Sequence, residues 1–320
     1  MTKLERHIVT FAPIAFLLKK SKHWFFPGFE GVPLFDVIKF FYKQVRTVGL
    51  SERASAIAYN LIMATPPAFL FLFTLIPKLP FLNQRNIKIQ LHFLVTDMIP
   101  AKAYNQDILK FIDSFFASSK IGLISFGFLL ALFFASNAMM GIMRSFNKNY
   151  VGFEKRAGFQ KRKTAIKLTS LLFALFLGCL LLLITQSSVL KWFGVKNYGW
   201  RQAIVYTKWI VMIALIFYSF AFIYKYAPAV KKRWKLVSPG AILATSLSIL
   251  ATLGFSYFVN NFGRYSVLYG AIGTVIVMMA LIYINSLVLL IGFELNVSIK
   301  SLKARAEKRD AEEKAVAQTT

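Results

Sequence analysis

Six apolar runs, each long enough to cross a lipid bilayer, constrain this chain more than any other feature of its sequence. At 1.5 Å of rise per residue, a helix of about 20 apolar residues spans the roughly 30 Å of membrane hydrocarbon. The runs lie near Ala54–Pro77, Ile121–Ile142, Ala165–Thr185, Ile204–Tyr226, Pro239–Phe258 and Gly270–Leu295. Only 16% of the 320 residues are charged, whereas soluble domains have about a quarter. The sequence predicts an all-α fold, a polytopic membrane helix bundle with about six transmembrane helices plus amphipathic interfacial helices.

The distribution of basic residues predicts the orientation of the bundle. Most of the 39 Lys and Arg residues lie before the first span, between the second and third, between the fourth and fifth, and after the sixth. The positive-inside rule places these segments, and with them both termini, in the cytoplasm. We expect a cytoplasmic N-terminal region 1–53, a six-span membrane domain 54–298, and a basic tail 299–320 that continues the last span as a solvated helix. The net charge of +26 would indicate nucleic acid in a soluble protein, but here it favours anionic lipid head groups.

Motifs for enzymatic or metal chemistry are missing from the sequence. His7, His23 and His92 are far apart, and no HxxxH or CxxC spacing occurs, so we expect no metal and no cofactor. The single cysteine, Cys179, cannot form an internal disulfide. No span holds paired carboxylates, and GxSxG, HExxH and P-loop motifs do not occur. The sequence therefore does not predict an enzyme.

Two segments outside the spans have helical apolar spacing. The first, ahead of span one, places Leu34, Ile38, Phe41, Tyr42 and Val45 opposite Asp36, Lys39, Lys43 and Arg46. It is typical of an interfacial helix on the cytoplasmic leaflet, acting either as a lipid sensor or as an anchor for span one. The second, Lys78–Lys120, predicts two short amphipathic helices on the outer face, as a lid over a cavity or as ordinary packing on the bundle.

A stripe of polar residues follows one face of the fifth span. Its members are Thr245, Ser248, Thr252, Ser256 and Asn260, and Arg264 continues it at the outer surface. Steps of three or four residues place all of them on one side of a helix. The stripe predicts either a helix that lines a polar cavity or close helix packing with hydroxyls bonded to their own backbone.

Other polar groups within the spans are candidates for the same path. Span one contains Tyr59 and Asn60, followed by Pro66 and Pro67, and paired prolines predict a kink or break. Breaks of this kind occur at transport sites, and kinks also occur without a transport role. Asn137 in span two and Asn285 in span six predict hydrogen bonds between helices.

Glu294 is the one acidic residue within the expected spans. It lies about 36 Å along the helix from Gly270, which places it near the cytoplasmic surface. Arg53 at the start of span one and Arg144 at the end of span two are on the same side, so an ion pair with either is expected. The alternative role for Glu294 is a proton- or cation-coupling group.

Four stretches carry a family resemblance. They are Ala56-Ile57-Ala58-Tyr59-Asn60 with Pro66 and Pro67, Phe146–Tyr150 with Lys161-Arg162-Lys163, Tyr224–Pro228 with Ser238-Pro239-Gly240-Ala241, and Tyr269–Gly273 with Leu290–Asn296. On these residues the chain, from about Asp36 to Asn296, resembles the BrkB/YihY-type family of bacterial inner-membrane proteins. It departs from the family pattern at Ala280-Leu281-Ile282, at Phe293 and in the doubled proline, and these departures affect packing.

The resemblance implies six spans, an inner-membrane location and cytoplasmic termini. The family carries an older ribonuclease label, but the sequence lacks the cluster of His and Asp ligands that a metal-dependent nuclease needs. Some members are connected with envelope lipid transport. Three hypotheses follow: a transporter or lipid translocator of the cell envelope, a non-transporting scaffold, and an intramembrane enzyme acting on lipids. The expected partners are membrane lipids, especially anionic head groups, and not nucleic acid; a homo-oligomer is left open.

Overall fold

The structure is a computed structural model, and it describes residues 24, 26–75, 88–89, 92, 109–110, 113–114, 121–147, 153–154, 156–192, 198–230, 233–262 and 271–319. Apart from an isolated bridge between Phe153 and Val230, these residues form helices and their connections. Seven long helices make up the fold: α3 Leu34–Thr47, α4 Leu50–Leu75, α7 Ile121–Phe146, α8 Gly158–Trp192, α9 Tyr198–Tyr226, α10 Pro239–Phe262 and α12 Ala271–Thr319. The all-α prediction is confirmed.

Each of the six expected spans coincides with one long helix, from α4 to α12. Four helices are apolar and long enough within the described residues to cross a membrane: Phe126–Phe146, Trp209–Tyr226, Pro239–Val259 and Val275–Arg309. These four support a multi-span membrane protein. Six remains the predicted number of spans.

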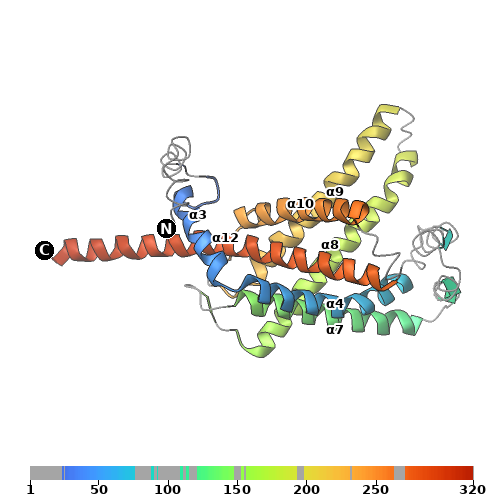
Figure 1. Cartoon of the computed structure of the whole chain (residues 1–320), viewed down its shortest axis with the longest axis horizontal. Helices are drawn as coiled ribbons and strands as arrows, with labels where there is room; N and C mark the ends of the chain where they lie inside the picture. Colours follow the sequence, from blue (N-terminus) through green and yellow to red (C-terminus); the bar gives the residue numbers. More distant parts are fainter. Residues whose placement is uncertain are drawn as a thin grey trace.

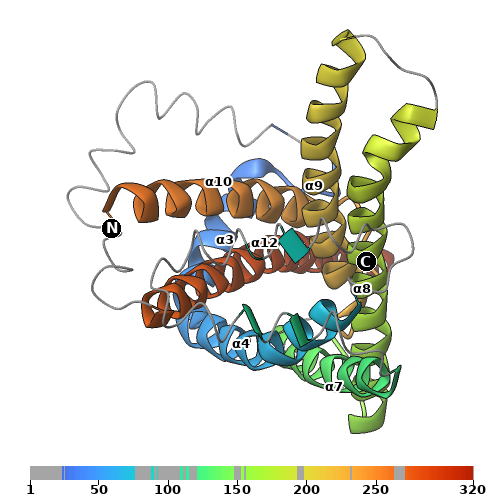
Figure 2. The same ribbon diagram turned by 90° about the vertical axis from the view of Figure 1, so that its right-hand side faces the viewer.

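The six helices other than α3 form a closed ring. Helix α4 packs on α7, α7 on α8, α8 on α9, α9 on α10, α10 on α12, and α12 returns to α4. Figure 2 shows α12 running between α10 and α4. In Figure 1, α8 and α9 lean away from the other four helices toward one end of the molecule. The ring is therefore tighter at one end than at the other.

The main core lies at the end where α4, α8 and α10 begin and where α7 and α9 finish, which we call the packed end. Its largest buried side chains include Phe146, Tyr224 and Phe293. The rings of Phe146 and Phe293 stack with centroids 3.9 Å apart, and Trp234 lies 5.6 Å from Phe293. Because lipid is as apolar as these side chains, close van der Waals packing is what holds helices together in a membrane.

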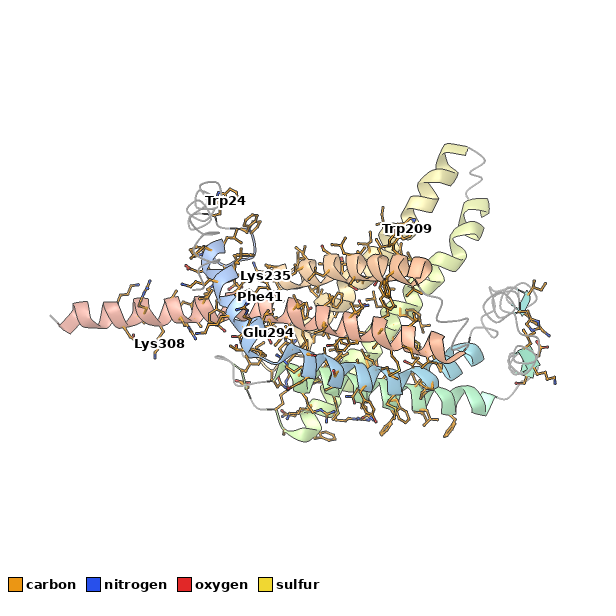
Figure 3. All side chains as sticks on the ribbon, viewed as in Figure 1. Trp24, Phe41, Trp209, Lys235, Glu294 and Lys308 are labelled. Atoms are coloured by element: carbon orange, nitrogen blue, oxygen red, sulfur yellow. The ribbon has the colours of Figure 1, made fainter. Side chains whose placement is uncertain are left out.

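The opposite end, which we call the splayed end, exposes large apolar side chains on several helices. They include Phe126 and Leu129 of α7, Trp209 and Ile210 of α9, Leu253 and Tyr257 of α10, and Val275 and Ile276 of α12. Figure 3 shows Trp209 on the part of α9 that leans away from the bundle. The two ends therefore differ in how completely the helices bury one another.

Two glycines allow the closest helix approach at the packed end. A Cβ atom added to Gly240 of α10 would lie 2.1 Å from the Gly292 carbonyl oxygen of α12, and one added to Gly292 would lie 2.5 Å from the Tyr224 hydroxyl. Asn296 accepts a hydrogen bond from the Gly240 amide at 2.9 Å and donates one to Ser238 Oγ at 3.0 Å. A side chain of α12 thus caps the first turn of α10. These contacts give a structural role to two stretches that carry the family resemblance, Ser238-Pro239-Gly240-Ala241 and Gly292–Asn296.

Helix α4 is continuous through Pro66 and Pro67, so span one is not broken there, and a kink at the paired prolines stays a prediction. Proline has a backbone φ that suits a helix, and what it costs is the hydrogen bond to the carbonyl four residues earlier. Here the carbonyls of Ile62 and Met63 lose those donors. Membrane helices tolerate this loss where neighbouring groups satisfy the backbone.

Helix α3 crosses α12 near the packed end (Figure 1) and belongs to a second, smaller core. Its most buried residue is Val37, which packs with Val32 and with Ile299 of α12. Ile38 and Tyr42, which the sequence places on the apolar face, are each 54% exposed. The amphipathic helix occurs where the sequence predicts it, and part of its apolar face points away from the protein.

Most of the expected outer segment, Lys78–Lys120, lies outside the described residues. The parts that are described are helical. Lys88 Nζ lies 3.0 Å and His92 Nε2 2.7 Å from Asp113 Oδ1. This contact joins the two halves of the segment. Its role as a lid or as packing stays a prediction.

Candidate functional site

A buried ion pair lies at the packed end. Arg53 Nη1 of α4 lies 2.6 Å from Glu294 Oε1 of α12, and the two side chains are 8% and 0% exposed. Arg53 Nη2 also donates to the Ser145 carbonyl of α7. One guanidinium therefore links three helices of the ring. Figure 3 shows Glu294 on α12 at the level where α4 begins.

The sequence offers two partners for Glu294, Arg53 and Arg144. The structure brings Arg53 to Glu294 and leaves Arg144 exposed on the last turn of α7. A carboxylate with no exposed surface is stable as an ion only when an opposite charge or hydrogen bonds compensate for lost water. Arg53 supplies both to Glu294.

An open hollow of about 320 Å³ adjoins this pair between α4 and α7. It is lined by Glu52, Arg53, Ala56, Asn60, Gly141, Arg144 and Ser145. Asn60 Nδ2 donates to the Ala56 carbonyl at 2.7 Å, and a Cβ added to Gly141 would lie 2.9 Å from the same nitrogen. The missing side chain at Gly141 thus makes room for the Asn60 amide at the wall of the hollow.

The polar stripe on α10 has two different environments. Thr245 and Ser248 are buried; Thr245 Oγ1 donates to the Ala241 carbonyl at 2.8 Å, and Ser248 Oγ donates to Asn285 Oδ1 on α12. One and two helical turns farther on, Thr252 and Ser256 are exposed. The side chain of Asn260 and all of Arg264 lie outside the described residues. The stripe is therefore packed near the packed end and open toward the splayed end.

The other polar candidates do not meet in one place. Asn137 of α7 accepts a hydrogen bond from Arg162 Nη1 of α8, whose guanidinium carbon lies 4.7 Å from the Phe133 ring centroid. Tyr59 is 62% exposed. Pro66 is exposed and Pro67 is partly buried. Asn60 alone among these candidates lines the hollow beside the ion pair.

Sequence reasoning missed several polar contacts at the packed end. Tyr224 is fully buried and its hydroxyl donates to the Leu289 carbonyl at 2.8 Å. The hydroxyls of Ser51 and Tyr283 lie 2.8 Å apart. Arg156 donates to the carbonyls of Ala227 and Pro228 at 3.1 and 2.9 Å, just after α9 ends. Their only signal in the sequence is that Tyr224, Ala227 and Pro228 belong to a stretch that carries the family resemblance.

A second hollow, of about 170 Å³, lies between α4, α7 and α8. Its lining is aromatic and aliphatic except for Thr169, and three of its rings, Phe71, Phe128 and Phe173, lie with centroids 5.2 to 6.1 Å apart. Thr169 Oγ1 is buried and meets no hydrogen-bond partner in the described part of the chain. Over the same residues, no group of three His, Cys, Asp or Glu side chains is placed to hold a metal ion.

Comparisons with known proteins agree with this architecture. The family described as "Virulence factor BrkB" matches residues 41–318. YfkH of Bacillus subtilis, whose name describes it as ribonuclease-like, is 28% identical over 256 residues, which cover 79% of this chain and 90% of YfkH. A UPF0761 membrane protein of Tolumonas auensis is 24% identical over 268 residues, or 81% of this chain and 84% of that protein.

A third relative, the UPF0761 membrane protein NTHI0384 of Haemophilus influenzae, is 24% identical over 277 residues, covering 83% of this chain and 96% of its own length. No solved structure is detectably similar. The family match covers most of the chain, and the relatives align over nearly their whole lengths. The chain therefore belongs to the BrkB family of membrane proteins.

Proposed function

We propose that this protein is a transporter or lipid translocator of the bacterial inner membrane. The observation that carries the proposal is the contrast between the two ends of the helix ring. At the packed end, aromatic packing and the Arg53–Glu294 pair close the ring. Toward the splayed end, α8 and α9 lean away from the other helices and the polar stripe of α10 becomes exposed.

The stripe supplies polar contacts where lipid alone would offer none. Thr245, Thr252 and Ser256 lie within about 40° of one another around α10, at 100° per residue. Near the packed end this face meets α12 through Ser248 and Asn285, and beyond that contact Thr252 and Ser256 have no helix over them. A polar molecule, or the head group of a lipid, could therefore follow the stripe while apolar parts stay in the bilayer.

Orientation completes the proposal. The basic connections between helices lie at the packed end, so the positive-inside rule directs that end to the cytoplasm. In this arrangement the path is closed toward the cytoplasm and open toward the outer leaflet. Transport would then require the packed end to open, with a change in the Arg53–Glu294 contact, as alternating access demands.

The proposal is tested by lipid translocation in proteoliposomes. Purified protein is reconstituted with a head-group-labelled anionic phospholipid, and an impermeant quencher is added outside. We expect the label of the inner leaflet to become accessible with the wild-type protein and not in protein-free vesicles. Thr252→Leu with Ser256→Leu should slow this access strongly. Ser246→Leu is the matched control, because it places the same side chain on α10 outside the stripe.

Equal quenching in all samples would exclude general lipid translocation. Equal rates of quenching with the wild-type protein and with the Thr252→Leu, Ser256→Leu variant would show that the stripe of α10 is not part of the path. If neither protein moves lipid, the second candidate function gains support.

The second candidate is a scaffold for other envelope proteins, and α12 is the observation that favours it. This helix continues without interruption to Thr319, far beyond the bundle (Figure 1), and Arg305 to Arg309 are exposed. A solvated helix of this length offers a binding surface. A scaffold predicts specific proteins that crosslink to the full chain in the membrane and are lost when residues 305–320 are deleted.

A further inference from the structure

The hollow between α4 and α7 has two side chains of opposite charge on its rim. Glu52 belongs to the first turn of α4 and Arg144 to the last turn of α7, and both are exposed. Within the described residues, neither forms an ion pair. The hollow therefore offers one cationic and one anionic group that no side chain in the described part of the chain neutralises.

A third charged group lies deeper in the same hollow. Arg53 lines it, is only 7% exposed, and is held by Glu294 and by the Ser145 carbonyl. Its Nε is buried and meets no acceptor among the residues that the structure describes. An oxyanion seated in the hollow beside Arg144 would also lie close to the positive charge of Arg53.

We infer that this hollow binds the head group of a phospholipid that carries a phosphodiester next to a primary ammonium group. The phosphate lies between Arg144 and Arg53, and the ammonium group lies at Glu52. The inference rests on the proposed function, since it names the class of lipid that the protein handles at its packed end.

Charge and hydrogen bonding select this head group. A head group with only negative charge would meet the arginines but be repelled by Glu52. A quaternary ammonium group carries no N–H donor for the Glu52 carboxylate, whereas a primary ammonium group carries three, as in lysine. A phosphodiester with a primary ammonium therefore matches all three charged groups.

The exposed face of α4 indicates a membrane lipid rather than a soluble phosphate ester. Tyr59 and Met63 are 62% and 49% exposed. At 100° per residue, both lie within about 20° of Glu52 around α4. They continue the rim of the hollow toward the middle of the span, which is the direction an acyl chain takes from a head group at the membrane surface.

Binding is measured by native mass spectrometry of the full chain. Phosphatidylethanolamine, phosphatidylglycerol and phosphatidylcholine with identical acyl chains are added at equal concentration. We expect phosphatidylethanolamine to be retained about tenfold more than either of the others, the effect of about one charge-assisted hydrogen bond. Glu52→Gln should remove the preference over phosphatidylglycerol, and Glu52→Lys should reverse it. Arg144→Gln should weaken the binding of phosphatidylethanolamine and of phosphatidylglycerol.

Lys163→Gln and Glu312→Gln are the matched controls, because both side chains are exposed and neither lines the hollow. Equal retention of the three lipids, or a preference that survives Glu52→Lys, would overturn the inference. Displacement of the lipid by an equal concentration of free phosphoethanolamine would overturn the assignment to a lipid.

The two proposals can fail separately. Translocation without a head-group preference would remove this site and leave the transporter proposal standing. A preference that follows Glu52 and Arg144, in a protein that moves no lipid, would support the site and count against transport.

Discussion

Replacing Glu294 by Gln should destabilise the bundle more than any other single loss of charge in the described residues. The substitution leaves Arg53 charged, 7% exposed and without a carboxylate. Two unit charges about 4 Å apart attract by about 4 kcal/mol at an effective dielectric constant near 20. Breaking a buried pair by removing one member typically costs about 3–5 kcal/mol. Because Gln can still accept a hydrogen bond from Nη1, we expect the free energy of unfolding to fall by about 3 kcal/mol, the lower end of that range.

The double variant Arg53→Met, Glu294→Met should recover most of this loss. Replacing both members of a buried pair by apolar side chains of similar volume is often close to neutral, since the cost of removing both charges from water disappears. The Ser145 carbonyl would lose the donor that Arg53 supplies. The recovery should therefore fall short of the wild-type stability by about 1 kcal/mol.

Equilibrium unfolding in mixed micelles, followed by circular dichroism, measures these free energies. Glu312→Gln is the control, since its pair with Lys308 spans 3.6 Å between side chains that are 66% and 80% exposed. Such surface pairs contribute less than about 1 kcal/mol. A loss below about 1 kcal/mol for Glu294→Gln, or a double variant as unstable as Glu294→Gln, would refute the view that an isolated buried charge causes the loss.

Three further predictions concern other contacts. Gly240→Ala should prevent tight packing of α10 on α12, because its Cβ would lie 2.1 Å from the Gly292 carbonyl oxygen. Gly254→Ala on the same helix is the control: its Cβ meets open space, so it should be neutral or slightly stabilising. The thermal unfolding midpoints of the two variants check this. Thr169→Val should raise the free energy of unfolding by about 1 kcal/mol, since it removes a buried hydroxyl with no partner in the described residues, and unchanged or lower stability would contradict it. Burial raises the pKa of Glu30, but Lys300 and Lys303 outweigh it and hold that pKa below its ordinary value of 4.5. The contact of Glu30 with α12 should therefore be fully stabilising above pH 4.5 and weaken as the pH falls through the lower pKa that Glu30 has in the folded protein. Backbone hydrogen exchange in residues 26–37, corrected for the intrinsic rate, should rise on acidification in the wild-type protein. In Glu30→Gln the corrected exchange should not change over the same pH range.

The positions of the long helices could be predicted from the sequence because lipid imposes apolar runs of a definite length. Their ends could not be predicted from the same signal. Helix α8 begins at Gly158 and ends at Trp192, beyond both limits of the expected span Ala165–Thr185. The continuation of α12 past Leu295 could be predicted from a different signal, the Lys-, Ala- and Glu-rich composition of the tail, which forms helix well in water. The apolar run shows which residues lie in the lipid, whereas the helix itself continues as long as its backbone hydrogen bonds form.

The candidate site could be predicted only in part. A lone acid in an apolar span, with basic residues on the same side, is visible in the sequence and indicates an ion pair. Which arginine reaches Glu294 depends on how α4, α7 and α12 pack, and the sequence alone leaves Arg53 and Arg144 equivalent. The Asn296 cap on α10 and the Tyr224 contact with Leu289 join residues 56 and 65 positions apart. Periodicity describes the face of one helix and carries no information about such partners.

Helix α12 extends from the membrane bundle into the space beyond it as one continuous helix. It has 49 residues and is therefore about 74 Å long, and no Gly or Pro follows Gly292 to act as a hinge. The part from Ala306 to Thr319, beyond the contact of Arg305 with the Phe40 ring of α3, is about 21 Å long at 1.5 Å per residue. A tilt of about 10° at Glu294 would swing the far end of the helix, about 38 Å away, by about 7 Å. Because the same helix carries Asn285, Glu294 and Asn296, it works as a lever arm: a partner that held its outer end would restrain the stripe, the ion pair and the α10 cap together.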